Sequence, residues 1–194
     1  MKTLTGLLVA AFFSISLSLV AEDQKFEIDT VHSHLGFKVK HLSISNVAGS
    51  FNTFTGHWVI DSKTNALKEL EGKVEIKSVD TNNAKRDEHL RKPDFFGEDK
   101  HPEMTFKLKK YLPSGKISGD LTIKGITKTA IWDAEVTKVI ENPMNKGETL
   151  KQGISITGTI NRKDFKIGDE YPDAVISDSI KISIELEGDA PNKK

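Results

Sequence analysis

Apolar and polar residues alternate along most of the chain after residue 25. This period of two is typical of β-strands that place one face against a core and the other in water. In the last such stretch, every second residue from Ile180 to Leu186 is a large aliphatic residue, and the residues between them are polar. The pattern predicts eight strands, at residues 26–41, 47–60, 67–80, 102–112, 115–125, 129–138, 151–163 and 174–187.

Short turn-forming segments separate most of the predicted strands, as at residues 61–65, 113–115 and 142–147. Consecutive strands joined by short turns form an antiparallel meander, and eight strands are enough to close it into a barrel without free edges. We therefore predict an all-β fold, an eight-stranded antiparallel up-and-down β-barrel of the lipocalin-like kind.

The connection between the third and fourth predicted strands is longer and has a different pattern. Residues 83–91 read as a short helix with Asn82 or Asn83 as its N-cap, and a proline then stops the helix. The adjacent rings of Phe95 and Phe96 follow, as a flap over the barrel mouth or as a plug that packs the helix onto the barrel. One ring is expected to face inward, and the sequence does not say which.

The first 21 residues have the composition of a secretory signal peptide. Lys2 supplies a charge, an apolar run follows, and the small Ala21 offers a cleavage site. The run is shorter than a transmembrane helix, which needs roughly 20 apolar residues. We therefore expect a signal peptide at residues 1–21, a single domain at residues 22–194, and a periplasmic or secreted product without an anchor.

The chain has 28 basic residues, 28 acidic residues and no cysteine. Without a net positive charge, no broad basic field gathers nucleic acid or an anionic membrane. No other segment is apolar over a membrane-spanning length. We expect neither nucleic-acid binding nor stable membrane insertion, whereas a homodimer through an exposed strand face stays open.

Small and bulky residues mix on the predicted strands, which leaves the interior of the barrel undecided. Glycines such as Gly56, Gly72 and Gly158 either mark bends in coiled strands or make room for a cavity, while Trp58 and Trp132 supply large apolar surfaces. An eight-stranded barrel is filled by its own side chains or holds one small ligand. Residue types alone do not choose between the two.

Four long blocks of sequence carry a family resemblance. They are IDTVHSHLGFKVKHLSISNVAGSF at residues 28–51, SVDTNNAKRDEHLRKPDFFGEDKHPEMTF at 78–106, GDLTIKGITK at 119–128 and INRKDFKIG at 160–168. In content and order these blocks resemble the YceI-like family over essentially the whole chain beyond residue 21. The segment at residues 169–172 departs from that pattern, because it is longer and more polar.

The resemblance implies a lipocalin-like barrel whose apolar interior holds long-chain isoprenoids, isoprenoid quinones or other amphiphiles. Such a lipid-binding protein requires no cofactor and is not an enzyme. Burial of hydrocarbon is worth about 0.8 kcal/mol per methylene, so a chain of about a dozen carbons offsets the cost of association without a strong polar contact.

Inward-facing apolar residues are the candidates for contact with this lipid, although the same residues would pack an ordinary filled core. The candidates are Phe37, Val39, Phe51, Phe54, Trp58, Val74, Ile76, Phe95, Phe96, Phe106, Leu108, Leu121, Ile123, Trp132 and Ile182.

Three polar residues near the predicted rim are candidates to meet a lipid head group. Arg86 and His89 share one face of the predicted helix, and a guanidinium suits a phosphate or carbonyl oxygen. His41 lies at the end of the first predicted strand. The alternative, which we favour for Arg86 and its neighbour Asp87, is that these side chains tie the helix to the adjacent strands.

His32 and His34 lie two residues apart, the spacing at which one face of a strand presents two metal ligands. No third ligand follows at a recognisable spacing, so we expect no metal. A metal-dependent enzyme that uses both histidines is the main alternative function, and a filled barrel that acts through protein partners is another. No nucleophile elbow, phosphate-binding glycine loop or HExxH motif is present, so we expect no enzymatic activity.

Overall fold

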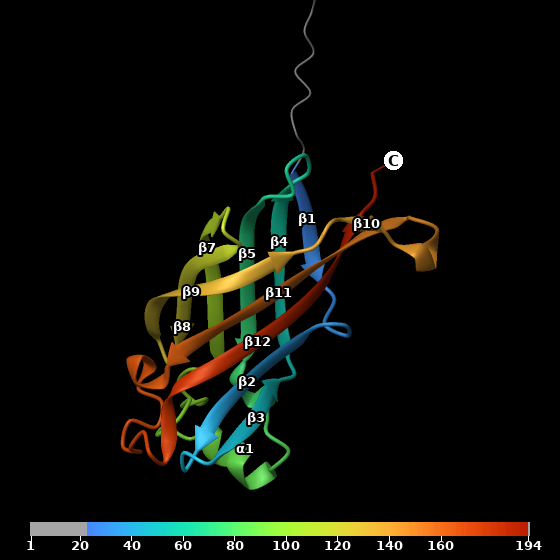
Figure 1. Ribbon diagram of the computed structural model, residues 1–194. Helices are drawn as coiled ribbons and strands as arrows, with labels where there is room; N and C mark the ends of the chain where they lie inside the picture. The colour runs from blue at the N-terminus through green and yellow to red at the C-terminus, as the bar shows by residue number, and fades with distance from the viewer. Residues whose placement is uncertain (1–22, 194) are drawn as a thin grey trace, which may run out of the picture.

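The computed structural model describes residues 23–193, which form an antiparallel β-barrel with one short α-helix. Eight strands close the ring in the order β1–β4–β5–β7–β8–β9–β11–β12, because β12 pairs with both β11 and β1. The predicted fold class is confirmed (Figure 1). The ring strands are β1 (Asp23–Ile28), β4 (Phe54–Asp61), β5 (Leu67–Glu75), β7 (Glu103–Leu112), β8 (Lys116–Ile123), β9 (Ile126–Val136), β11 (Thr149–Asn161) and β12 (Ile176–Pro191). The remaining strands are β2 (His34–His41), β3 (Ser45–Phe51), β6 (Val79–Asp80) and β10 (Ile140–Glu141).

The prediction of one continuous strand at residues 26–41 is wrong, because β1 and β2 are separated by a break at residues 29–33. Asp29 Oδ1 accepts the N–H of Val31 at 3.0 Å, which turns the chain out of the strand. Ser33 then contacts the edge of β12, where its Oγ accepts a hydrogen bond from the N–H of Glu187 at 2.9 Å. Both β1 and β2 therefore lie along β12, one after the other.

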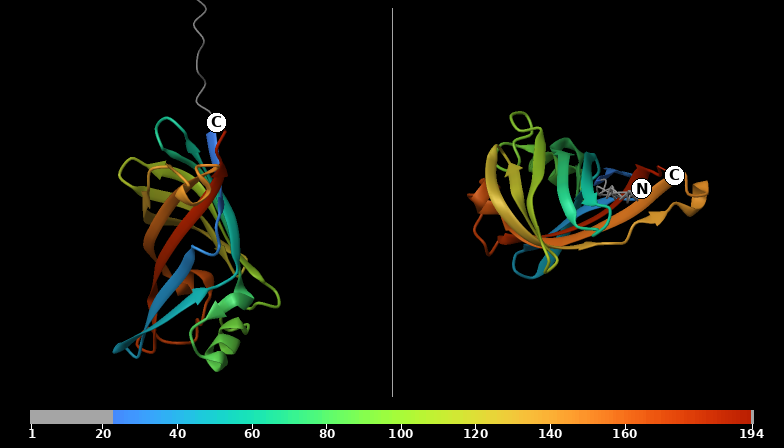
Figure 2. Two further views of the ribbon diagram at one scale, coloured as in Figure 1. Left: turned by 90° about the vertical axis from the view of Figure 1, so that its right-hand side faces the viewer. Right: turned by 90° about the horizontal axis from the view of Figure 1, so that it is seen from above.

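The predicted strand at residues 47–60 is likewise divided, into β3 and β4, by Asn52 and Thr53. β4 continues round the barrel through β5, whereas β3 pairs with the short β6. β6 is reached through a 3₁₀ turn at Ile76–Ser78, so the predicted strand at residues 67–80 bends away from the wall after Glu75. β2 and β3 are therefore not among the eight ring strands but form a two-stranded hairpin that continues the sheet from β12 (Figure 2).

The predicted helix is present as α1 (Ala84–Arg91), and Asn83 is its N-cap. The side-chain oxygen of Asn83 accepts the N–H of Arg86 at 3.0 Å and so satisfies one of the free donors of the first turn. α1, the 162–176 segment and the tip of the β2–β3 hairpin lie at the lower end of the barrel in Figure 1, opposite the start of β1.

Large side chains fill the other end of the barrel. Phe26 and Trp58 stack there with ring centroids 5.5 Å apart, and both are fully buried with Ile60 and Ile154. Trp58 Nε1 donates to Gln152 Oε1 at 2.7 Å, so the polar atom of the indole is satisfied inside the core. Within residues 23–193, no helix is both long and apolar enough to cross a membrane. The signal peptide expected at residues 1–21 lies outside the described residues.

Candidate functional site

An apolar cavity of about 400 Å³ occupies the lower half of the barrel. It extends from the level of Leu70 and Leu186, next to the packed end, to α1 and the 162–176 segment. Its size falls in the range of small-molecule sites, roughly 300–1,000 Å³. The barrel is therefore filled at one end and hollow at the other.

Most of the apolar residues that the sequence proposed as ligand contacts lie on the wall of this cavity. Because no ligand is present, their contact with one stays a prediction. The residues on the wall are Phe37, Val39, Phe51, Phe54, Val74, Phe95, Phe96, Phe106, Leu121, Ile123, Trp132 and Ile182.

Three of the proposed contacts lie elsewhere. Trp58 belongs to the packed end of the barrel, and Ile76 is buried in the 3₁₀ turn where the chain leaves the wall. Leu108 precedes a register shift between β7 and β8 and packs against the core away from the cavity. Periodicity places all three on an inward face, but it does not say at which level of the barrel the hollow part begins.

Glycines explain how a wall with such large rings still encloses an open space. The Trp132 indole lies directly over Gly158 on the neighbouring strand, where a Cβ would overlap the ring. The ring therefore lies flat on the wall and stacks on Phe106 with centroids 5.2 Å apart. Three wall rings are accommodated in this way: Phe37 over Gly49, Phe106 over Gly119 and Trp132 over Gly158.

Gly72 differs from these glycines because no ring covers it. It lines the cavity, and the nearest heavy atom to a Cβ built there is the carbonyl oxygen of Thr55, at 3.9 Å. The opposite residue on β4 is Gly56, so two facing positions lack side chains. Gly56 allows close approach of the two strands, and Gly72 leaves open space in the cavity wall beside Phe54 and Val74.

Both Phe95 and Phe96 lie on the cavity wall, whereas the sequence predicted one inward ring. The Phe96 ring meets the Phe51 ring edge-on with centroids 5.6 Å apart. The Phe95 ring stacks on Tyr171 at 5.4 Å. Tyr171 belongs to the polar segment at residues 169–172 and also lines the cavity, so the segment that departs from the family pattern helps to close this end.

Arg86 makes the structural contacts that we favoured and also lines the cavity. Its Nε and Nη2 donate to the hydroxyl and carbonyl oxygens of Thr81, both at 2.8 Å. Asp87 accepts the N–H of Thr81 at 2.9 Å, so the two side chains join α1 to the residue that follows β6. His89 and His41 line the cavity as well, and His89 Nε2 lies 2.7 Å from Asp94 Oδ2. These positions form the polar part of the cavity rim.

Arg162 is a wall residue that the sequence interpretation missed. Its side chain is only 1% exposed, and its guanidinium donates to backbone carbonyls between residues 167 and 177, including that of Ile176 at 2.9 Å. It also forms a 2.8 Å ion pair with Asp178. The Arg162 side chain therefore holds in place the 162–176 segment, which closes the lower end of the cavity. The block INRKDFKIG contained it, but nothing in the local pattern distinguished a buried arginine from an exposed one.

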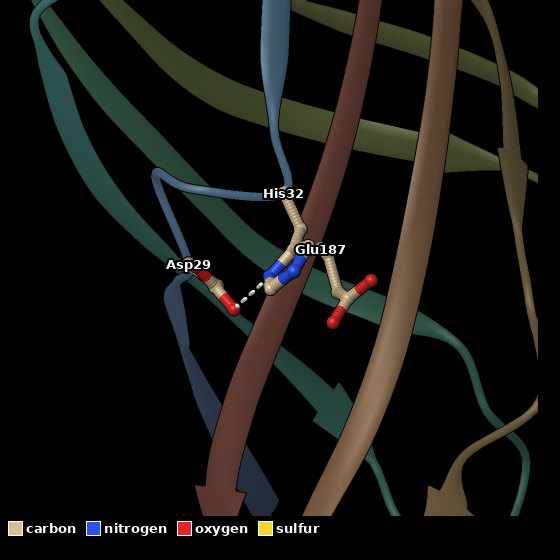
Figure 3. A group of neighbouring side chains, drawn as sticks. All are labelled: Asp29, His32 and Glu187. Carbon is tan, nitrogen blue, oxygen red and sulfur yellow. Dashed lines mark hydrogen bonds and ion pairs between the residues drawn. The ribbon is translucent and has the colours of Figure 1, made fainter.

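His32 and His34, which the alternative metal-dependent enzyme would use as ligands, do not lie on one strand, because β2 begins at His34. His32 lies in the break between β1 and β2, and its Nδ1 is 2.8 Å from Asp29 Oδ2 with Glu187 nearby (Figure 3). Lys151 Nζ lies 3.1 Å from Asp29 Oδ2 and 2.8 Å from Glu187 Oε1, so an ammonium already neutralises these carboxylates. The group is a surface ion-pair network that joins the break to β11 and β12.

The pKa values of this network agree with that description. The hydrogen bond from His32, together with Lys151, holds the pKa of Asp29 at about 2 despite partial burial. The bond to Asp29 raises the pKa of the exposed His32. Burial lowers the pKa of Lys151, but hydrogen bonds to three carboxylates outweigh it and raise the pKa above its ordinary value. A protonated lysine in this position disfavours a cation among the same oxygens.

Comparison with known proteins gives consistent matches. The profile of the YceI-like domain matches residues 26–188. A UPF0312 protein of Pectobacterium atrosepticum is 34% identical over 190 residues, covering 96% of each chain. The crystal structure of a Campylobacter jejuni YceI protein is 39% identical with a TM-score of 0.71, covering 86% of this chain and 96% of that one. A polyisoprenoid binding domain from Saccharophagus degradans has a TM-score of 0.65 at 17% identity, covering 86% of this chain and 98% of that domain, and so shares the fold.

Proposed function

The chain belongs to the YceI-like family, and on that premise we propose that it binds the hydrocarbon chain of an isoprenoid-type lipid inside its barrel. The observation that carries the proposal is the apolar cavity whose aromatic wall lies flat on glycines. A barrel that served only as a scaffold would have side chains in this space. The fold that it shares with a polyisoprenoid binding domain supports the same class of ligand.

Burial of hydrocarbon can supply the free energy of binding without a specific polar contact to the lipid. Each buried methylene contributes about 0.8 kcal/mol, and association costs roughly 4–15 kcal/mol. About a dozen buried carbons contribute roughly 10 kcal/mol, which offsets a cost near the middle of that range, and each further carbon adds to the affinity. The polar end of the lipid would lie at the rim beside His41, Arg86 and His89, where hydrogen-bond donors are available.

Sequestration or transport of such a lipid through an aqueous compartment is the activity we propose. The predicted signal peptide at residues 1–21 supports action in the periplasm or outside the cell. The binding function needs no cofactor and no covalent chemistry. Lys151, seated among the carboxylates near His32, disfavours the alternative of a metal-dependent enzyme.

A volume series at Gly72 tests this proposal. A side chain at residue 72 would enter free space in the cavity, so Gly72→Ala, Gly72→Val and Gly72→Phe should fold while filling it progressively. Geranylgeraniol is titrated into residues 22–194, and binding is followed by tryptophan fluorescence, because Trp132 lies on the wall. We expect a graded loss of affinity that reaches about tenfold or more for Phe, about 1.4 kcal/mol.

Gly153→Ala is the matched control, because Gly153 lies on β11 outside the cavity lining and a Cβ there meets only ordinary contacts, the nearest at 3.5 Å. The control should bind as the wild type does. If the Gly72→Phe variant is folded and also binds like the wild type, the lipid does not occupy the cavity and the proposal fails.

A further inference from the structure

The tip of the β2–β3 hairpin exposes two large apolar side chains next to the cavity rim. Leu42 is 49% exposed and Ile44 is 84% exposed. The adjoining His41 lines the cavity, and the N–H of Leu42 donates at 2.9 Å to the carbonyl oxygen of Val175, another wall residue. The apolar tip is therefore fixed to the edge of the opening.

The backbone of this tip does not favour the residues it carries. Leu42 and Ser43 have φ values of 51° and 58°, and the N–H of Ile44 closes the turn onto the carbonyl oxygen of His41 at 3.2 Å. A turn with two positive φ values is normally built from Asn and Gly, because leucine in this conformation costs roughly 1–2 kcal/mol. For Leu42, both the positive φ and the exposure of an apolar side chain to water are unfavourable, which points to a role in contact with another surface.

Although the chain as a whole has no net positive charge, the outer face of this hairpin is locally basic. Residues 34–51 include Lys38 and Lys40 and contain no acidic residue, in a chain with 28 acidic residues in total. Lys38 lies directly opposite Lys181 of β12, an arrangement of like charges that destabilises a sheet. Among residues 23–193, none of these three lysines forms an ion pair.

Two acidic side chains of the adjoining segment, Asp173 and Asp178, have contacts of their own. Asp178 is paired with Arg162 and Lys163. Asp173 accepts the N–H of Asp178 at 2.7 Å. The hairpin therefore combines an apolar tip with unpaired lysines, and its inner face, with Val39 and Val47, is part of the cavity wall.

We propose that the β2–β3 hairpin docks on the surface of a phospholipid bilayer that contains anionic lipids, with Leu42 and Ile44 inserted among the acyl chains. The lysines lie at the head groups, where each cation near an anionic leaflet gains about 1 kcal/mol. Docking places the cavity rim against the bilayer, so a lipid can pass between them without crossing water. The inference rests on the proposed function, since it supplies the route by which the cavity is loaded.

Vesicle flotation with residues 22–194 tests the docking. The vesicles contain phosphatidylcholine with about one quarter phosphatidylglycerol. The test variant combines Leu42→Asn with Ile44→Ser, because Asn tolerates positive φ and the turn should fold at least as well. The control is Met144→Asn, which removes an apolar side chain that is 90% exposed in the 3₁₀ turn Pro143–Asn145, outside the cavity lining and away from the hairpin.

We expect the wild type and the Met144→Asn variant to float with the vesicles, and the tip variant to lose about tenfold or more in binding. Added salt should weaken wild-type binding, because the lysines contribute through screened charges. Wild-type protein that does not float, or a tip variant that floats equally well, overturns the inference. So does a tip variant that changes only the oligomeric state, which would assign the tip to a second copy of the chain.

A second readout separates this inference from the proposed function. Geranylgeraniol is supplied either from dilute ethanol or preloaded in the vesicles. The tip variant should bind the ethanol-supplied lipid normally and extract the vesicle-bound lipid more slowly than the wild type. Normal extraction by the tip variant refutes docking and leaves the binding function intact, whereas failure of all proteins to bind from ethanol refutes the binding function itself.

Discussion

Replacement of Gly158 by alanine tests whether glycine keeps the cavity open. A methyl group at this position would overlap the Trp132 indole, so the ring must rotate off the wall and toward the lumen. That movement breaks the stacking on Phe106 and the 3.3 Å hydrogen bond from Trp132 Nε1 to the carbonyl oxygen of Thr159. The substitution should therefore lower both stability and lipid capacity.

The expected size of the effect follows from opposing contributions. Overpacking a core costs about 1–3 kcal/mol, and the lost aromatic stacking about 0.5–1.5 kcal/mol. Alanine in a strand regains about 0.5–1 kcal/mol relative to glycine. We predict that Gly158→Ala lowers the free energy of unfolding by about 1–3 kcal/mol.

A double-mutant cycle with Trp132→Leu identifies the cause. Without the indole, Gly158→Ala should be neutral or slightly stabilising, which gives a coupling energy of about 2 kcal/mol between the two sites. Urea unfolding measures the four free energies, and geranylgeraniol titration measures the lipid capacity. A Gly158→Ala cost that is the same with and without Trp132 would refute the reasoning, because the ring would then not be the group displaced.

Three further substitutions test other parts of the structure. Asp29→Asn should lower the free energy of unfolding by about 1–2 kcal/mol at neutral pH, after solvent screening is taken into account. Because the pKa of Asp29 in the folded protein, about 2, lies below the ordinary 3.8, this loss is present above about pH 4 and vanishes as the pH falls toward 2. Urea unfolding that finds the loss independent of pH would contradict the assignment. Arg162→Met removes one of the two cations that pair with Asp178 and leaves several buried carbonyls without their donor, so it should destabilise the protein by about 3–5 kcal/mol. Amide exchange in residues 166–176 should become faster, and unchanged exchange there would argue against the role of Arg162. Trp58→Phe removes the donor to Gln152 and should cost about 1–3 kcal/mol in unfolding experiments while leaving geranylgeraniol affinity unchanged, so a loss of affinity would place Trp58 at the lipid after all.

The alternating pattern was sufficient to predict the barrel, because each strand has one face in the core and one in water. It was not sufficient to place the breaks at Asp29–Ser33 and Asn52–Thr53, which depend on pairing with β12 and β6. The alternation changes phase at each break, because the inward residues pass from Ile28 to Leu35 and from Phe51 to Phe54. A prediction that ignores this change of phase reads each pair of strands as one. The separation of the β2–β3 hairpin from the ring is a tertiary effect.

The cavity could be predicted only in part for a similar reason. An inward apolar residue packs a core or lines a cavity according to what lies opposite, and that partner comes from another strand. Trp58 and Trp132 each stack on a phenylalanine and lie over a glycine, yet Trp58 belongs to the packed end and Trp132 to the cavity wall. Arg162 was missed because its acceptors are backbone carbonyls, which leave no mark in the sequence.

Mass spectrometry of organic extracts tests the central claim most directly. The mature protein is purified without detergent beside a Trp132→Arg variant, in which a charged side chain enters the cavity wall. The account predicts an isoprenoid or isoprenoid quinone near one per chain in the wild type, and its loss from the folded variant. The contrary result is a folded wild-type protein that contains no lipid and does not bind added isoprenoids. That result would contradict the claim that the barrel is a lipid-binding site.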